Sequence, residues 1–238
     1  MIRLTEELGG GIDEHTLVCL HFDDENNISK NECGKDVEIV PIKEGLSNFL
    51  IDNGKFGKAY GGNGKYFFNN TEDGYETISV EFFTLAYSNI AQNTFNIKFK
   101  NSNNELWLGI KQYSHGKSDM GMWSLDTNSG WEINHNYFYT ESWVWNHVYL
   151  NISKTLVEVY INGNYYGNCA NGEFEWISIN GFGLYNNNSY IDEIRVSDIF
   201  RHTSNFIPPN RPFMKDSHKI FNENKNLYGI YFFYHPIN

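Results

Sequence analysis

Apolar and polar residues alternate with a period of two along most of this chain. In TFNIKFK (residues 94–100) polar residues separate the apolar positions Phe95, Ile97 and Phe99. The same alternation runs through ETISVEFF (76–83), NHVYLNI (146–152) and TLVEVYI (155–161). A period of two is typical of a strand with one buried face, because successive side chains point to opposite sides of a sheet. No segment predicts an amphipathic helix.

Turn signals separate these runs. Asn-Gly favours tight hairpin turns because both residues tolerate positive φ, and it begins at Asn53, Asn63, Asn162, Asn171 and Asn180. In VEVYINGNYYGN (157–168) the dipeptide lies between two strand-like runs, which predicts a hairpin. Many short strands with regular turns predict an all-β fold, a two-sheet antiparallel β-sandwich or jelly roll.

Composition narrows the possible partners. The 238 residues suit either one large all-β domain or two small ones, and 40% hydrophobic and 17% aromatic residues suffice for a core. A net charge of -11 disfavours nucleic acid and anionic membranes. The segment MIRLTEELGGGIDEH lacks a basic region followed by an apolar run, and no apolar segment approaches ~18 residues. We therefore expect neither a signal peptide nor membrane insertion.

The three cysteines are Cys19, Cys33 and Cys169. An odd number leaves one unpaired, and none lies in a C-x-x-C motif with metal-ligand spacing. Cysteine is among the most frequently buried residues, so we expect free buried thiols.

Four motifs in order resemble a known family. They are HTLVCLHFDD (15–24), GKFGKAYGGNGKYFF (54–68), WNHVYLNISKTLVEVYINGN (145–164) and YIDEIRVSDIFRHTSNFIPP (190–209). Together they are similar to the laminin-G-like, concanavalin-A-like jelly rolls of bacterial and phage surface proteins. This resemblance implies an N-terminal arm (1–14), one laminin-G-like β-sandwich (15–210) and a C-terminal extension (211–238).

The closing motif, followed by Arg201, Phe206 and Pro208-Pro209, resembles laminin-G-like modules of phage tail proteins. The resemblance implies a non-enzymatic structural or adhesion module on a virion tail or extracellular particle. It would bind a host cell-surface glycan or decorate the tail, with other tail proteins or copies of itself as partners. A bacterial surface or secreted lectin, and a glycan-cleaving enzyme without the usual acids, remain as alternatives.

Acidic residues argue against the enzyme. Related laminarinase-type jelly rolls carry three acids at alternate positions of one inner strand. The nearest pattern is Glu173 and Glu175 in GEFEW, where Ile177 takes the third position. His147, beside Trp145, matches a packed structural histidine of the resembled family, so we assign no catalytic residue.

Aromatic residues offer a binding surface. Aromatic rings can stack on the apolar faces of sugars, and six candidates cluster in the segment without family motifs: Trp107, Tyr113, Trp123, Trp131, Tyr137 and Tyr139. Large aromatics also fill cores and protein interfaces, and this alternative stays open.

A calcium site is expected at Asp192. Strict alternation would place Asp192 on one face with Ile194 and Val196, where a carboxylate needs a partner. Many laminin-G-like domains hold a structural ion, and the resemblance implies Ca²⁺ between Asp192 and Asp23, with carbonyls from a turn at residues 61–64. The alternative is that Asp192 accepts backbone hydrogen bonds or pairs with an arginine.

The segment NLYGIYFFYHPIN (226–238) is too apolar for a solvated tail. Its large residues are Leu227, Tyr228, Ile230, Tyr231, Phe232, Phe233 and Tyr234. The run 230–234 is apolar on both faces, which predicts a strand buried between two surfaces. We expect an intersubunit contact here.

Overall fold

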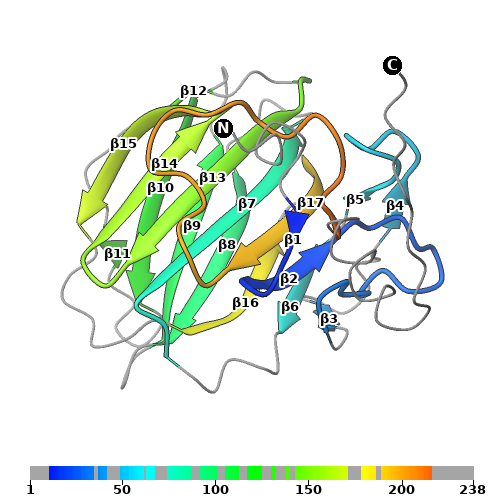
Figure 1. Ribbon diagram of the computed structural model, residues 1–238, viewed down its shortest axis with the longest axis horizontal. Helices are drawn as coiled ribbons and strands as arrows, with labels where there is room; N and C mark the ends of the chain where they lie inside the picture. The colour runs from blue at the N-terminus through cyan, green and yellow to red at the C-terminus, as the bar shows by residue number, and fades with distance from the viewer. Residues whose placement is uncertain are drawn as a thin grey trace, which may run out of the picture.

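Two stacked β-sheets form the protein in the computed structural model (Figure 1). It describes residues 11–34, 37–41, 49–61, 63–67, 74–86, 92–100, 105–112, 117–124, 130–131, 138–139, 143–170, 178–185 and 189–215. Every regular element in these residues is a β-strand, and pairing within both sheets is antiparallel. The prediction of an all-β, two-sheet jelly-roll sandwich is confirmed. Across the same residues there is no helix long and apolar enough to cross a membrane.

Sheet I is the sheet at the front of Figure 1. Its strands are, in order, β15 (Asn164–Ala170), β14 (Leu156–Ile161), β13 (Asn146–Ser153), β7 (Thr77–Ala86), β17 (Ser189–Ser197), β5 (Ala59–Gly61) and β4 (Phe49–Ile51). An eighth strand, β2 (Thr16–Leu20), also pairs with β17.

Sheet II lies behind it. Its order is β11 (Gly130–Trp131), β10 (Lys117–Ser124), β9 (Glu105–Gln112), β8 (Gln92–Lys100), β16 (Ser178–Tyr185), β6 (Asn63–Phe67) and β3 (Glu38–Pro41). The short β12 (Phe138–Tyr139) pairs with β10.

The predicted turn at residues 61–64 is instead a passage between the two sheets. Gly61 ends β5 in sheet I, and Asn63 begins β6 in sheet II. The Asn63-Gly64 dipeptide begins β6 and pairs with β16, and the Asn180-Gly181 dipeptide lies within β16, at a register shift against β8. Cross-strand pairing therefore outweighs the local turn preference of Asn-Gly at these two places.

The Asn162-Gly163 hairpin is confirmed. It joins β14 to β15, and its two residues have φ of 51° and 78°. Positive φ at both central residues is the requirement of a type I′ turn, which matches the natural twist of paired strands.

The core between the sheets contains the apolar positions predicted by the period of two. In β13 these are Val148, Leu150 and Ile152, all fully buried. The same cluster holds Val18, Leu20, Phe22, Val37, Tyr60, Ile78, Val80, Phe82, Val157, Val159, Ile161, Ile191, Ile194 and Val196. Each buried side chain of this size stabilises the fold by about 1.5–3 kcal/mol relative to exposure.

A non-regular segment, residues 198–213, crosses the outer face of sheet I and is called the strap here (Figure 1). It continues into β18 (Met214–Lys215), which pairs parallel with β1 (Gly11–Ile12). Phe213 packs with Ile12 and Cys19 in a second, smaller apolar cluster. Residues 11–14 and 211–215 therefore pack against the sandwich itself.

A β-bulge in β17 changes the predicted face of Asp192. Asp192 pairs with Phe83 and Arg195 with Glu81, so β17 has one residue more than β7 over this interval. Glu193 adopts a φ of 53° there. The extra residue reverses the alternation. Ile191 therefore joins Ile194 in the core, and the prediction that Asp192 shares their face is wrong.

Candidate functional site

Two of the predicted aromatic residues occupy directly paired positions in sheet II. Trp107 in β9 is the cross-strand partner of Trp123 in β10, and Lys98 in β8 is the next partner in this row. Directly paired residues share one face of a sheet. The backbone therefore places both tryptophans on one face, beside a lysine.

The neighbouring row on the same face contains three glycines. Gly121 pairs with Gly109, Gly109 with Asn96, and Asn96 with Gly183. Glycine therefore occupies three of the four positions in the row next to the tryptophans.

The opposite face of sheet II has an apolar row. Met122, Leu108, Ile97 and Phe182 are successive partners across four strands. An apolar face packs against a second sheet in a sandwich, so the tryptophan pair belongs to the outer face.

The remaining predicted aromatics divide between the two faces. Trp131 pairs with Met122 and so shares the apolar face. Tyr139 pairs with Lys117, which lies an even number of residues from Trp123 in β10 and therefore on the same face as Trp123. Tyr113 and Tyr137 lie outside the described residues. The structure thus brings Trp107, Trp123 and Tyr139 to one face and separates Trp131 from them.

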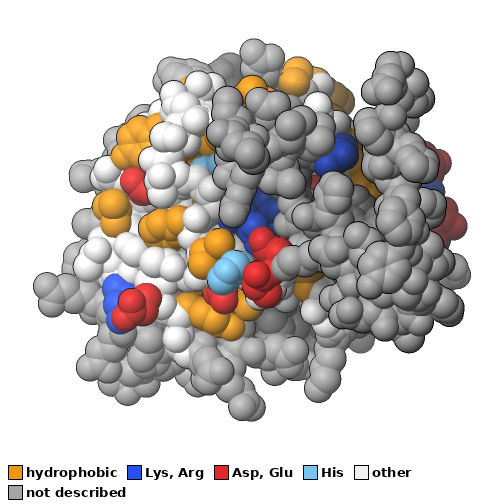
Figure 2. Space-filling view, viewed as in Figure 1, with side chains coloured by type: hydrophobic (Ala, Val, Ile, Leu, Met, Phe, Trp, Pro, Cys, Tyr) orange, Lys and Arg blue, Asp and Glu red, His pale blue; other side chains and the backbone are white. Residues whose placement is uncertain are grey.

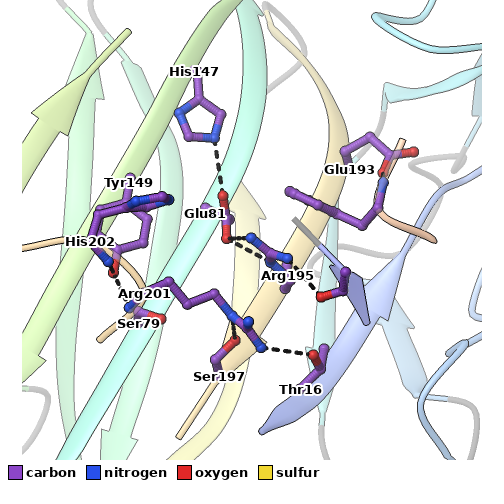
Figure 3. A network of polar contacts seen from close by, with 12 residues as sticks. Thr16, Ser79, Glu81, His147, Tyr149, Glu193, Arg195, Ser197, Arg201 and His202 are labelled. Atoms are coloured by element: carbon purple, nitrogen blue, oxygen red, sulfur yellow. Dashed lines mark hydrogen bonds and ion pairs between the residues drawn. The ribbon is translucent and has the colours of Figure 1, made fainter. Parts of the chain in front are cut away.

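A buried polar network occupies the outer face of sheet I, beneath the strap (Figure 3). Glu81 of β7 is its centre and is 1% exposed. Arg195 Nε donates to Glu81 Oε1 at 2.6 Å, and His147 Nε2 lies 3.3 Å from Oε2. Burial alone would raise the pKa of Glu81, but the charge of Arg195 and the contact with His147 lower it to about 2.

The strap is fixed by hydrogen bonds to Tyr149 (Figure 3). The backbone N–H groups of Arg201 and His202 donate to Tyr149 Oη at 2.8 Å and 3.0 Å, and Tyr149 Oη donates to Asn151 Oδ1 at 2.6 Å. The His202 ring stacks on Phe206 with centroids 3.7 Å apart. Burial lowers the pKa of His202 to about 4 and raises that of Tyr149 to about 12.

His147 has the packed role that the sequence predicts. It is 1% exposed and lies between the rings of Phe83 and Phe206, at centroid distances of 4.8 Å and 5.7 Å. Its Nδ1 has no hydrogen-bond partner. These groups are buried beneath the strap, where their mutual contacts stabilise the fold.

The visible face of sheet I shows mostly apolar and uncharged side chains, with a histidine and several charged side chains near its centre and further charged side chains at its lower left edge (Figure 2). A separate pocket of about 530 Å³ is lined by the loop after β2, including Asp23, Asp24, Glu25 and Glu32. Phe22, at its start, has a φ of 64°, which is unusual for a bulky residue.

The two predicted metal ligands are linked by the loop at residues 52–58. Asp192 is fully buried, and its Oδ2 accepts a hydrogen bond from the Phe56 N–H at 2.9 Å. Asp23 Oδ1 accepts one from the Lys58 N–H at 2.8 Å. Burial, together with the charges of Glu193 and Asp23, raises the pKa of Asp192 to about 8.

The backbone hydrogen-bond alternative for Asp192 is therefore confirmed for one oxygen. The other, Oδ1, has no hydrogen-bond partner of good geometry. This orphaned oxygen fits a cation. In the described part of the chain no three His, Cys, Asp or Glu side chains are grouped to hold a metal. A calcium ion would need carbonyl oxygens or water as further ligands.

The sequence missed the buried network. Glu81 occupies a polar position of ETISVEFF, which predicts a solvent-facing side chain. Two signals were available in the sequence. Arg195 is an opposite charge in another strand-like run, and the aromatic, proline-terminated sequence after that run could cover both charged residues.

No protein-family model and no curated protein sequence matches this chain. Solved structures do resemble it. Domain 4 of AbnA, a GH43 extracellular arabinanase from Geobacillus stearothermophilus in complex with arabinotriose, has a TM-score of 0.56 and 18% identity. The match covers 77% of this chain and 92% of that domain.

Two structures of the binding domain of botulinum neurotoxin DC, one in complex with rat synaptotagmin II and one with SialylT, each have a TM-score of 0.55 and 14% identity. The matches cover 90% and 91% of this chain, and the chain spans 52% of each neurotoxin domain. At these identities the likeness establishes the shared β-sandwich fold.

Proposed function

We propose that this chain is a non-enzymatic glycan-binding module whose binding face is the outer face of sheet II. The observation that carries the proposal is the pairing of Trp107 with Trp123 on a polar face. Tryptophans on a face turned away from the second sheet are not needed to fill the core between the sheets, whereas a sugar ring can stack on them. Glycine at three of the four positions in the adjacent row would leave room for the ring, and Lys98 in the tryptophan row would offer a hydrogen-bond donor to its hydroxyl groups.

The solved structures support this choice of ligand class. The arabinanase domain is described in complex with arabinotriose, and one neurotoxin binding domain in complex with SialylT. Their fold is thus compatible with carbohydrate recognition. The other neurotoxin complex contains the protein synaptotagmin II, which makes a protein receptor the second candidate ligand.

We place the module on a phage or phage-like tail, where it would attach to a host surface glycan. The closing motif IDEIRV with its Pro208-Pro209 ending supports this placement through its resemblance to tail modules. Tail proteins or further copies of the chain would be its neighbours. Antibody against the chain should decorate tail-like particles in electron micrographs, and labelling of cell surfaces alone would favour the lectin alternative.

A structural Ca²⁺ between Asp23 and Asp192 forms part of the proposal. The Oδ1 of Asp192 supports it, because a hard cation would satisfy a buried carboxylate oxygen that has no hydrogen-bond partner of good geometry. The ion would fix the loop at residues 52–58 against β17.

The binding face is tested with single alanine variants. Trp107→Ala and Trp123→Ala should each weaken binding to host cell-wall polysaccharide about fivefold, since a stacked ring contributes on the order of 1 kcal/mol. Tyr166→Ala is the matched control, because Tyr166 is an exposed aromatic residue of sheet I, and its affinity should equal that of the wild type.

Trp131→Ala separates binding from stability. Its position on the apolar face predicts a lower melting temperature with unchanged glycan affinity in the folded fraction. Wild-type affinity in both Trp107→Ala and Trp123→Ala would contradict the proposed face. Release of reducing ends from the polysaccharide would instead support the enzyme alternative.

A further inference from the structure

Two thiols meet beside β2. Cys19 lies in β2 and is fully buried. Cys33 lies at the end of the loop after β2, which lines the 530 Å³ pocket, and is partly exposed. Neither cysteine is in a disulfide, and the Cys33 side chain packs against the small apolar cluster that contains Cys19. Neither contributes to the proposed glycan-binding face.

The backbone holds the two cysteines together. Asn31 Oδ1 accepts hydrogen bonds from the Cys19 N–H at 2.9 Å and from the Cys33 N–H at 3.1 Å. The Glu32 N–H donates to the Cys19 carbonyl at 3.0 Å. Residues 31–33 therefore return alongside β2, and one side-chain oxygen bridges the backbones of both cysteines. A disulfide requires such proximity, because it spans only about 4.4–6.8 Å between Cα atoms.

We propose that Cys19 and Cys33 form a thiol–disulfide site that reacts with a small-molecule disulfide such as oxidised glutathione. The Cys33 thiolate attacks one sulfur of the small disulfide, breaks its S–S bond and releases one small thiol. Cys19 then attacks the Cys33 sulfur of the mixed disulfide and displaces the second small thiol. The protein loses two electrons and two protons, and the two released thiols carry them away.

The order of the two attacks follows from exposure. Cys33 is the thiol that solvent reaches, so it meets the small disulfide first. The contact with Cys33 and burial raise the pKa of the Cys19 thiol well above its usual range. Cys19 is fully buried, so the small disulfide does not reach it, and it acts as the resolving cysteine once Cys33 carries the mixed disulfide.

The disulfide would stabilise this side of the molecule. It would close a loop of residues 19–33, which contains most of the pocket lining around Asp23, and it would join that loop to the cluster that Cys19 forms with Ile12 and Phe213. Restricting a loop of this length in the unfolded chain should raise the melting temperature by about 5–10 °C.

The test uses the full chain, purified reduced and then exposed to oxidised glutathione. We expect a product lighter by two hydrogens, a Cys19–Cys33 link in the peptide map and a higher melting temperature. Cys169→Ser should form the same link. Cys33→Ser should form no internal link and show no rise in melting temperature, and it avoids disturbing the buried Cys19 position.

Three results would overturn the site. They are a lasting glutathione adduct on Cys33 without resolution, a link that contains Cys169, and unmodified thiols at both positions under conditions that oxidise the unfolded chain. Substituting Asn31→Ala gives an independent measure, because loss of the bridging oxygen should slow formation of the internal link. An unchanged rate in that variant would show that the bridge does not position the pair.

Discussion

Glu81 carries a charge in a site closed to water, and Arg195 supplies the opposite charge. Both side chains are at most 2% exposed, and the guanidinium also donates to the Gly11 carbonyl at 3.0 Å. Phe213 covers the guanidinium, whose central carbon lies 4.1 Å from the ring centroid. Residues from β7, β17, β1 and the strap thus satisfy one another, and removal of any one leaves a buried group without its partner.

Glu81→Gln should therefore destabilise the protein by about 3–5 kcal/mol, because it leaves the Arg195 charge buried without a counter-charge. Urea unfolding would measure the loss. Glu158→Gln is the matched control: Glu158 accepts a hydrogen bond from Asn151 Nδ2 at 3.0 Å in a partly exposed position, so its cost should stay below about 1 kcal/mol. Equal losses in the two variants would contradict the role of the buried pair.

Acid should loosen the strap through His202. Its pKa of about 4 in the folded protein is below the usual 6.5, so this stabilisation is complete above pH 6.5 and is lost as the pH falls towards 4. Allowing for partial solvent exposure, we expect a decrease of about 1–2 kcal/mol in unfolding free energy. Glu81 adds a second loss between pH 4.5 and about 2.

The measurement is the unfolding free energy at pH values from 7 to 4. His202→Gln removes the titrating ring and should flatten the profile over that interval. A variant profile as steep as that of the wild type would assign the pH dependence to other groups.

Calcium should stabilise the wild type through Asp192. Added Ca²⁺ should raise the melting temperature and EDTA should reverse the rise, because the ion would satisfy the orphaned Oδ1. Asp192→Asn keeps an acceptor for the Phe56 N–H but cannot form the carboxylate that the ion would bind, so its melting temperature should not respond to Ca²⁺. An unchanged wild-type melt, with no metal found by elemental analysis, would remove the ion from the description.

At the scale of elements, the strands were predictable because alternation depends on local sequence. β7, β8, β13 and β14 coincide with the predicted runs. The bulge in β17 depends on the partner strand β7, and YIDEIRV alone carries no sign of it. The division of the aromatics by face also depends on register: it requires knowing that Trp131 is opposite Met122, which the segment 110–142 does not reveal.

The Asn162-Gly163 turn follows the local turn preference of Asn-Gly, and it also contacts the strap. The Phe206 N–H donates to the Gly163 carbonyl at 2.9 Å, and a Cβ added to Gly163 would lie 1.9 Å from the Phe206 carbonyl oxygen. Gly163→Ala must therefore displace the strap and also adopt a φ of 78°. We expect a loss of more than about 1 kcal/mol in unfolding free energy, with greater protease cleavage within residues 198–213.

Gly34→Ala is the matched control for that substitution. An added Cβ would have its nearest neighbour, Asn31 Nδ2, at 4.0 Å. Its stability should remain close to that of the wild type. If the two alanine variants melt at the same temperature, the turn does not hold the strap in place.

At the scale of the whole molecule, segments from both ends of the sequence complete one side of the sandwich. β1 and β18 pair with each other, and the Phe213 N–H donates to Glu193 Oε2 at 3.0 Å. Phe213 is 1% exposed, so the start of the C-terminal extension contributes to the fold. A deletion from residue 211 therefore removes part of the core, and a test of the extension must begin later in the chain.

Deletion of residues 216–238 should leave a folded sandwich with a melting temperature close to that of the full chain, because Phe213 and β18 remain. It should lower the oligomeric state measured by light scattering or block incorporation into the particle, since the two-faced apolar run at residues 230–234 would no longer be present to join subunits. Deletion of residues 211–238 is the contrasting variant. Loss of the buried Phe213 ring should cost about 3–5 kcal/mol in unfolding free energy. If the shorter deletion keeps the mass of the full chain in solution and still assembles, the segment at residues 226–238 does not form the expected intersubunit contact.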